Sequence, residues 1–557
     1  MADLSARQHQ MFPVLNHHQV ETAKRFASGE PKRFEPGDFV YRVGDYAAPA
    51  WLVLEGSMDV FRHEGLSHEA PITTHGVGQL SGEVNQLSGR PTLAGARAAG
   101  AGCMAIAFDA AHLRALVIGS ADVGEIIMRA FILRRVGLID AGAGSVLIGT
   151  AGNAALARLQ GFLARSAFPY IVLDAAAEGE GRALIERLGI LASELPLMVC
   201  PNGTVLKKPT DAEAATCLGM TPELKAGKVY DVAVVGAGPA GLATAVYAAS
   251  EGLDVVVIDE RSVGGQAGAS SRIENYLGFP TGISGQALAG RAYNQALKFG
   301  AEMVLPVEVS SLVPHEDERG ALRLELSGGK AVRARSVVIA SGARYRRPNV
   351  AQIETFEGNG VSYWASPIEA KLCAGEEVAL VGGGNSAGQA IAFLAPQVRK
   401  LHLVVRRALE ATMSQYLIDR IKALPNVELH MNCEVNAIAG DAATGLTSAV
   451  VRNLLDGSER QLPLHHLFLF IGADPNAGWV SDRVHTDDKG FIVTGQSFDK
   501  RCSFIRNPLP LETSLPNVFA IGDVRAGSTK RVAAAVGEGA AVVSQIHAAL
   551  SFSRVPR

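Results

Sequence analysis

Two glycine-rich loops, each placed directly after an apolar strand, set the strongest limit on how this 557-residue chain can fold. The first follows VYDVAVV and holds Gly236, Gly238 and Gly241 in the spacing G-x-G-x-x-G, before an alanine-rich helix and a second apolar strand. In such a βαβ unit these glycines permit, in order, the tight turn, backbone approach to a pyrophosphate, and close helix packing. Asp259 follows Gly236 by 23 residues, where a carboxylate can accept hydrogen bonds from a ribose diol. The unit therefore predicts a dinucleotide site.

The second loop lies in EEVALVGGGNSAGQA and predicts a different nucleotide. Its small positions and the residues between them are Gly382, Gly384, Asn385, Ser386 and Ala387. The same count of 23 residues from Gly382 reaches Val405, and Arg406 and Arg407 follow. A carboxylate there would repel a 2′-phosphate, whereas guanidinium groups bind it through paired charge-assisted hydrogen bonds. We therefore expect an NADPH site, the alternative being a solvated strand end that carries two arginines.

Several further motifs give the chain from Asp231 onward a resemblance to the low-molecular-weight thioredoxin reductases. They match that family's flavin contacts, a strand-end turn, and the segments that reach the ribityl chain and the pyrimidine end of the flavin. The matching residues are Gly264-Gly265-Gln266, Glu274-Asn275-Tyr276, Ala340-Ser341-Gly342, Gly522-Asp523 and Arg531-Val532-Ala533. The resemblance implies FAD in the first unit, NADPH in a second unit inserted into it, and a homodimer.

The chain departs from this family where the chemistry of the family depends on sulfur. The positions of its redox Cys-x-x-C are Ala365 and Ile368, and no Cys-x-x-C occurs anywhere in the chain. Without a thiolate, the relay from flavin to a thioredoxin disulfide is missing. The family's acid after the second cysteine is kept as Glu369, whose role is either proton transfer or that of a solvated carboxylate. Two residues of the family's nucleotide-phosphate motif are replaced, by Val405 and Ala411, which weakens the NADPH prediction.

The electron acceptor therefore has to be something else. Cysteine-free relatives include reductases that exchange electrons with ferredoxin or flavodoxin, so we expect such a carrier or a small molecule. The alternatives are a thioredoxin-disulfide reductase that uses other cysteines, and a flavoprotein redox or ligand sensor with little turnover. Tyr363 and Trp364 offer a stacking surface near the flavin or serve as ordinary packing, and packing is favoured.

The stretch PKRFEPGDFVYRVGDYAAPAWLVLEGSMDV has short strand-like segments separated by glycine and proline turns, typical of a β-roll. About residues 15 to 140 resemble the cyclic nucleotide-binding domains of catabolite-activator proteins. Gly82 and Glu83 stand in the family's ligand cassette, but Thr92 replaces the phosphate-binding arginine and Arg90 is displaced by two residues. The resemblance implies either an altered ligand, such as a cyclic nucleotide or cyclic dinucleotide effector, or a purely structural domain.

The segment after the β-roll alternates strand-like and helix-like stretches and weakly resembles a thioredoxin-like βαβαββ module. Its usual active-site cysteines are missing, so a spacer or docking role is expected. Cys200 lies within an apolar strand, which favours a core thiol over a redox thiol. Scattered single cysteines in a chain without a signal-peptide pattern favour a reducing, cytoplasmic setting.

Composition excludes some functions. The net charge is −3, so no concentrated basic face predicts nucleic-acid binding. Residues 232–250 carry no charge, but their glycines and proline indicate a strand, a turn and a helix start, not a membrane span. No metal-ligand pattern is visible.

We therefore expect a multidomain fold, since one core rarely exceeds ~250 residues. It comprises a β-roll with helices over residues 1–140, a small thioredoxin-like α/β module over 141–226, and a C-terminal α/β flavoprotein with two dinucleotide-binding domains. The FAD-binding domain is expected at 227–345 and 473–557, and the NAD(P)H-binding domain at 346–472.

Overall fold

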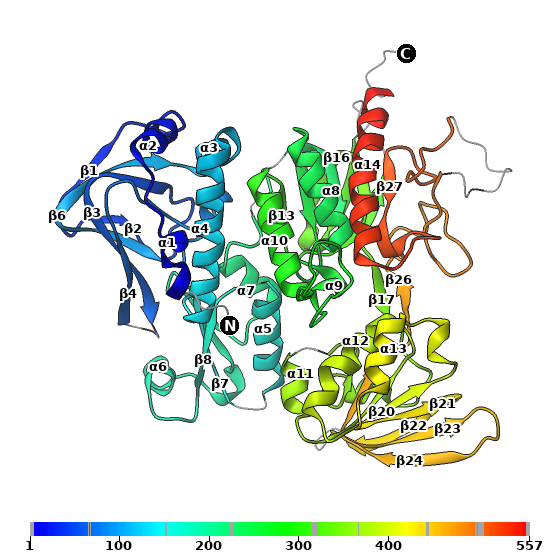
Figure 1. Cartoon of the computed structure of the whole chain (residues 1–557). Helices are drawn as coiled ribbons and strands as arrows, with labels where there is room; N and C mark the ends of the chain where they lie inside the picture. Colours follow the sequence, from blue (N-terminus) through cyan, green and yellow to red (C-terminus); the bar gives the residue numbers. More distant parts are fainter. Residues whose placement is uncertain are drawn as a thin grey trace.

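The computed structural model describes most of residues 5–552. The residues left out within this span are 65, 67, 151–152, 167, 223, 226, 315–320, 366, 442–444, 496–497 and 499–505, and only the backbone is described for 64, 367, 368 and 552. Figure 1 shows the β-roll at one side, the two nucleotide domains at the other, and a small sheet with its helices beneath the β-roll.

The N-terminal part folds as a six-stranded antiparallel β-roll closed by helices. Its strands are β1 (Lys32–Phe34), β2 (Phe39–Tyr41), β3 (Ala50–Glu64), β4 (His68–His75), β5 (Leu80–Ser81) and β6 (Gly95–Phe108). Long pairing of β3 with β6 and β4 curls the sheet around a core that includes Phe34, Trp51 and Met58. The helices are α1 (Gln8–Met11), α2 (His17–Lys24), α3 (Ala110–Gly119) and α4 (Ala121–Asp140). The expected β-roll with helices is confirmed.

The next segment forms a four-stranded sheet in the order β10-β9-β7-β8. Its strands are β7 (Ser145–Gly149), β8 (Tyr170–Asp174), β9 (Leu197–Val199) and β10 (Val205–Lys207). Its helices are α5 (Ala154–Arg165), α6 (Glu180–Leu188) and α7 (Asp211–Cys217). Strands β7 and β8 are parallel, while β9 and β10 run antiparallel to their neighbours. The side chains of α5 pack over this sheet, with Leu159 and Phe162 buried.

The first glycine loop lies in a seven-stranded sheet in the order β13-β12-β11-β16-β15-β14, with β27 beside β16. The strands are β11 (Val229–Val235), β12 (Val255–Ile258), β13 (Glu302–Val304), β14 (Val309–Val313), β15 (Leu322–Leu326), β16 (Ala331–Ile339) and β27 (Val518–Ala520). The helices are α8 (Pro239–Ser250), α9 (Gly265–Gly268), α10 (Gly285–Lys298) and α14 (Val532–Phe552). Residues 229–250 therefore form a strand, a turn and a helix, as expected.

Helix α14 is the one helix, among the residues described, with the length and apolar character to cross a membrane. It packs instead beside α8, and Val542, Ile546 and Ala549 join the core beneath the sheet.

The second glycine loop belongs to a separate parallel sheet in the order β18-β25-β19-β20-β21, backed by an antiparallel sheet β22-β23-β24. The strands are β18 (Val361–Ser362), β19 (Glu377–Val381), β20 (Lys400–Val405), β21 (Val427–Met431), β22 (Cys433–Asp441), β23 (Gly445–Asn453), β24 (Glu459–Pro463) and β25 (His466–Leu469). Its helices are α11 (Pro367–Leu372), α12 (Asn385–Leu394) and α13 (Gln415–Lys422). The short antiparallel pair β17 (Ala343–Tyr345) and β26 (Ala473–Pro475) joins this part to the seven-stranded sheet.

One continuous apolar core joins the β-roll to the seven-stranded sheet. Phe131 of α4 and Leu116 of α3 belong to the same buried cluster as Leu297 of α10 and Val234 of β11. Figure 1 shows α3 and α4 between the β-roll and α10. Since burial of this kind yields roughly 25 cal/mol per Å² of apolar surface, the β-roll is fixed to the nucleotide domain and is not tethered by a loose linker.

Candidate functional site

The first glycine loop shows which of its glycines the protein needs and which a ligand needs. Gly236 has φ +113°, and a Cβ there would lie 2.2 Å from the carbonyl oxygen of Ala340. A Cβ on Gly241 would lie 1.9 Å from the oxygen of Gly236, so both positions exclude side chains for internal reasons. At Gly238 the nearest atom to a Cβ would be the Cα of Gly265, 3.9 Å away. The protein leaves this space open, which fits a pyrophosphate lying against the start of α8.

Asp259 lies directly after β12, at the edge of the sheet where the loop opens. Its Oδ2 accepts a hydrogen bond from the backbone N–H of Ala237 at 2.8 Å, and Oδ1 accepts from those of Arg261 and Ser262. Burial raises the pKa of Asp259, although these hydrogen bonds favour its charged form. The carboxylate is thus fixed beside the loop, where a ribose would lie.

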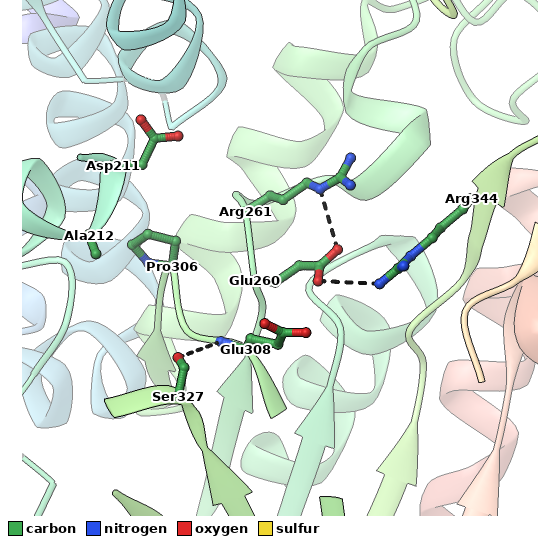
Figure 2. A pocket seen from close by; sticks show the side chains of 8 residues that line it. All are labelled: Asp211, Ala212, Glu260, Arg261, Pro306, Glu308, Ser327 and Arg344. Atoms are coloured by element: carbon green, nitrogen blue, oxygen red, sulfur yellow. Dashed lines mark hydrogen bonds and ion pairs between the residues drawn. The ribbon is translucent and has the colours of Figure 1, made fainter. Parts of the chain in front are cut away.

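An open cavity of about 400 Å³ lies next to this aspartate (Figure 2). Glu260 stands in its wall and pairs with Arg261 at 3.3 Å and with Arg344 at 3.7 Å. Asp211 and Ala212 of α7 form the opposite side. The four-stranded module therefore borders a cavity beside the segment that follows β12, which the sequence did not indicate.

The other flavin motifs lie around the same sheet edge, because β11, β16 and β27 are parallel and their carboxyl ends coincide. Gln266 of α9 donates from Nε2 to the oxygen of Ala343. Asp523 follows β27, and burial raises the pKa of its carboxyl group. Gly522 donates its N–H to Glu538 at 2.7 Å. The remaining motif residues are the exposed Asn275, Gly342 with φ +68°, Gly265 with φ +52°, and Arg531, Val532 and Ala533 at the start of α14.

The second glycine loop likewise has one glycine that the fold requires and one that leaves space for a ligand. Gly382 has φ +140°, and a Cβ there would lie 2.3 Å from the oxygen of Phe470. Gly384 has ordinary extended backbone and open space around it, so a ligand can approach the start of α12. Asn385 accepts a hydrogen bond at Oδ1 from the N–H of Ser414, 2.7 Å away, while Ser386 follows in the first turn of the helix.

Arg406 and Arg407 come directly after β20 and are exposed. Among the residues that the structure describes, neither forms an ion pair or a side-chain hydrogen bond. Both guanidinium groups are therefore available to a phosphate at this end of the parallel sheet. Val405 is buried, and Ala411 lies in a short turn after it; neither side chain has a polar group to offer a phosphate.

The region of the missing cysteines carries aromatic residues and one carboxylate. Ala365 is buried in the core of the second sheet, and the side chain of Ile368 lies outside the described residues. Tyr363 is buried and stacks on Tyr345 of β17, with ring centres 6.2 Å apart. Trp364 is more exposed and donates from Nε1 to Oε1 of Glu369 at 2.9 Å. This bond orients the carboxylate without assigning it a proton-transfer role.

The β-roll holds a second cavity, of about 250 Å³, at its ligand cassette. Gly82, Glu83 and Thr92 line it, whereas Arg90 does not. Arg90 instead points away from the cavity: its Nη2 donates to the oxygen of Met220, after α7 of the four-stranded module, at 3.5 Å, and its guanidinium lies 5.4 Å from the ring centre of Tyr293 of α10. Arg90 therefore does not take the place of the family's phosphate-binding arginine, because these contacts hold its side chain outside the cavity.

The cysteines correct one expectation from the sequence. Cys200 was expected as a core thiol, but it forms a disulfide with Cys217 at the end of α7. Their Cα atoms are 6.3 Å apart, within the usual disulfide range. The pairing arises because β9 and α7 end side by side, which a separation of 17 residues could not reveal. Cys103, Cys373 and Cys433 are buried free thiols, and burial raises the pKa of Cys373 to about 11; Cys502 lies outside the described residues.

A cluster of His402, Glu428 and His430 was not indicated by the sequence either. Their ligand atoms lie within 4.8 Å of one another, between the parallel sheet and β24. Lys400 and Arg460 already contact the carboxylate of Glu428, at 2.5 and 2.7 Å. A divalent cation would have to compete with both, so the cluster acts as a charge network that links the two sheets.

Comparison with known proteins agrees with this architecture. Residues 230–539 match the pyridine nucleotide-disulphide oxidoreductases, and residues 31–119 match the cyclic nucleotide-binding domain. The thioredoxin reductase of Listeria monocytogenes serovar 1/2a is 33% identical over 312 residues, which cover 56% of this chain and 91% of that protein. Alkyl hydroperoxide reductase F of Escherichia coli K12 is 32% identical over 318 residues, covering 57% of this chain and 58% of that one.

Solved structures extend the likeness to three dimensions. Thioredoxin reductase of Lactococcus lactis in its FR conformation superposes with a TM-score of 0.52 at 26% identity, covering 58% of this chain and 99% of its own. That of T. acidophilum gives 0.51 at 29% identity, covering 57% and 98%.

Two glycine loops, one on a mixed sheet and one on a parallel sheet, joined by a short strand pair, define a reductase with two dinucleotide-binding domains. The chain belongs to the pyridine nucleotide-disulphide oxidoreductase family, with thioredoxin reductases among its relatives, and it carries a cyclic nucleotide-binding domain before the reductase part. Enzymes of this family are FAD-dependent NAD(P)H oxidoreductases.

Proposed function

We propose that this chain is an NADPH-dependent FAD oxidoreductase that passes electrons to an acceptor other than a thioredoxin disulfide. When bound, FAD would take a hydride from NADPH and release electrons to that acceptor. FAD would be held by the loop at Gly238, by Asp259 and by Asp523. NADPH would be held by the loop at Gly384 and by Arg406 and Arg407.

The observation that carries the proposal is the combination of two open glycine loops with the loss of the thiol relay. Both loops keep free space where a pyrophosphate approaches, at Gly238 and Gly384. Yet Ala365 and Ile368 stand where the relatives' thiol chemistry takes place. Nucleotide binding is thus supported while disulfide output from this position is not. A one-electron carrier such as a ferredoxin or flavodoxin, or a small molecule, is the acceptor class that remains.

A second candidate function rests on the Cys200–Cys217 disulfide. It supports a disulfide reductase that uses cysteines outside the usual position, with Cys217 the more accessible partner. Against it, Cys217 lies at the far end of α7 from Asp211, and it is Asp211 that borders the cavity beside Asp259. A third candidate, a redox or ligand sensor with little turnover, rests on the β-roll fused to the reductase core.

Anaerobic rapid mixing with NADPH tests these functions. Fast loss of the visible flavin absorbance, followed by electron transfer to ferredoxin, flavodoxin or a quinone, supports the proposal. Thioredoxin reduction that is lost in Cys217→Ser supports the second candidate and overturns the first. Slow or absent loss of flavin absorbance supports the sensor.

The remaining parts of the proposal concern assembly and regulation. By analogy with thioredoxin reductases, we propose a cytoplasmic homodimer, which light scattering can test. A cyclic nucleotide or cyclic dinucleotide acting on the β-roll would regulate turnover through the shared core of α3, α4 and α10. A ligand changes the rate only through different affinities for two arrangements of the domains, with typical couplings of ~1–3 kcal/mol.

A further inference from the structure

The β-roll cavity has an apolar lining and little room for a large ligand. It has a volume of about 250 Å³ and lies between the sheet, α1 and α4. The apolar side chains around it come from all three: Met11, Phe12, Val60, Pro71, Ile72, Ala94, Leu138 and Ala141. A site of this size and character holds one compact ring system with a few polar contacts.

Two arginines stand in the wall of this cavity, the half-buried Arg62 of β3 and the buried Arg134 of α4. Arg134 of α4 is only 8% exposed. Its Nε donates to the oxygen of Met11 at 2.9 Å, and its Nη1 donates to those of Leu80 and Gly82 at 2.9 and 2.7 Å. These three bonds fix the guanidinium plane. Its Nη2 donates to no group in the described part of the chain, so two N–H donors remain for a ligand.

No acid neutralises Arg134. Its three partners are neutral carbonyl groups, and it forms no ion pair with any carboxylate of the described residues. Glu83, the acid of the cassette, also lines the cavity, but its Oε2 lies 3.6 Å from Nη1 of Arg135, the next residue of α4, and pairs with that cation instead. Burying a charge without a counter-ion is costly, and folded proteins normally pair such charges. The uncompensated charge therefore favours a ligand that brings the negative group.

Further polar atoms in the cavity have no partner. Nδ1 of His75 and Nε2 of Gln86 are buried without a hydrogen bond, although His75 and Gln86 are 2% and 1% exposed. Both residues line the cavity. The hydroxyl group of Thr92, by contrast, donates to the oxygen of Arg42 at 2.6 Å and is not available as a donor. Thr92 thus cannot stand in for the arginine it replaces.

We propose that this cavity binds a small, largely apolar organic anion, a carboxylate or a cyclic phosphodiester, whose negative group pairs with Nη2 of Arg134. The anion-binding residue has thereby moved from the cassette to helix α4. Gln86 and His75 supply secondary contacts, and the apolar wall holds the body of the ligand. This deepens the regulatory part of the proposed function but does not depend on the reductase reaction.

The position of Arg134 on α4 gives binding a route to the reductase. Its neighbour Arg135 points away from the cavity and lies 5.0 Å from the ring centre of Phe168 in the four-stranded module. Phe131, one turn earlier on α4, lies in the core shared with α10. An anion that draws α4 toward the cavity therefore acts on the contacts of two other domains.

Calorimetry on the full chain tests the binding with matched pairs of probes. The anions are cyclic AMP, cyclic GMP, benzoate and phenylacetate, and the neutral counterparts are adenosine, guanosine, benzamide and phenylacetamide. At least one anion should bind below millimolar and at least tenfold more tightly than its neutral counterpart. A phosphodiester that binds while the carboxylates do not assigns the ligand to nucleotides, and the reverse assigns it to organic acids. If no anion binds, or neutral partners bind equally well, the proposal is wrong.

Variants assign the anion to its residue. Arg134→Met should weaken the bound anion by roughly ten- to a hundredfold, the effect of one lost charge-assisted contact. Arg129→Met, the same change at an exposed position of α4, should leave binding as it is. Because Arg134 also bonds three carbonyls, its loss can unfold the β-roll, so a second variant is needed. Gly137→Leu fills the cavity from α4, with only Met11 within 4 Å of the new Cβ, and should abolish binding while the protein stays folded.

Two results would count against the assignment even if an anion binds. Unchanged anion affinity in Gly137→Leu would place the ligand elsewhere. If Arg90→Ala weakens anion binding and Arg134→Met does not, Arg90 is the anion-binding residue instead. Reduction of flavin by NADPH in the absence of probes is measured in parallel. A protein that binds the anion but has no reductase activity refutes the proposed function and leaves this inference standing.

Discussion

Replacing Gly238 by valine separates the binding of FAD from the stability of the fold. The backbone at Gly238 is extended, with φ −73° and ψ −178°, so a β-branched residue adopts it without strain. A Cβ there would meet nothing closer than 3.9 Å. At Gly241 the same atom would lie 1.9 Å from a backbone oxygen, so that substitution disrupts the loop itself. The fold thus tolerates valine at Gly238, and only the ligand is excluded.

The size of the effect follows from what the valine side chain displaces. Keeping a pyrophosphate away from this loop removes about two hydrogen bonds to a charged group, worth ~1.5–3 kcal/mol each. The affinity for FAD should therefore fall by roughly 10²- to 10⁴-fold. The melting temperature of the FAD-free protein should not change.

The assay is the ratio of visible flavin absorbance to protein absorbance after purification, followed by titration of FAD into the stripped protein. Gly290→Val in α10 is the matched control, since nothing lies within 4 Å of a Cβ there, and it should retain full FAD. A Gly238→Val protein that purifies with full flavin content would refute the assignment. If Gly238→Val loses flavin and its FAD-free form is also unfolded, the conclusion that Gly238 serves FAD binding but not the fold is refuted.

Four further predictions concern nucleotide choice, pH, the disulfide and regulation. Arg406→Ala should weaken NADPH by roughly ten- to a hundredfold in inhibition or binding assays and spare NADH; an equal loss for both nucleotides removes the argument. Burial lowers the pKa of His75 to about 3. Below pH 6.5 the imidazole is therefore protonated in the unfolded chain but stays neutral in the folded chain. The free energy of unfolding should then fall as the pH drops below 6.5, by ~2 kcal/mol at pH 5. Denaturant titrations at several pH values should show that this free energy depends less on pH in His75→Gln. Cys217→Ser opens a 17-residue loop, which should cost the four-stranded module ~3 kcal/mol in denaturant unfolding, and an unchanged midpoint would show that the disulfide does not stabilise it. An anion bound in the β-roll should change the rate of NADPH oxidation by roughly five- to 150-fold, and Glu83→Ala should leave the rate without ligand unchanged; binding without any rate change makes the β-roll structural.

The sequence by itself determined the reductase part in some detail. The spacing of Gly236, Gly238 and Gly241 is a local requirement of one turn, so it is legible without the rest of the fold. Arg406 and Arg407 could be placed for the same reason, since a strand and a helix of fixed length separate them from Gly382. The absence of thiols at Ala365 and Ile368 needed only a comparison of positions.

Tertiary structure decided the features that depend on which distant segments meet. The Cys200–Cys217 disulfide forms because a strand and a helix end side by side, and the contribution of α7 to the cavity beside Glu260 has no local sequence signal. Arg134 and Arg135 are adjacent in sequence, but successive residues of a helix point about 100° apart, so one faces the cavity and the other faces Phe168. Only the packing of α4 against the β-roll determines which arginine faces the cavity, and hence where a buried positive charge lacks a counter-ion.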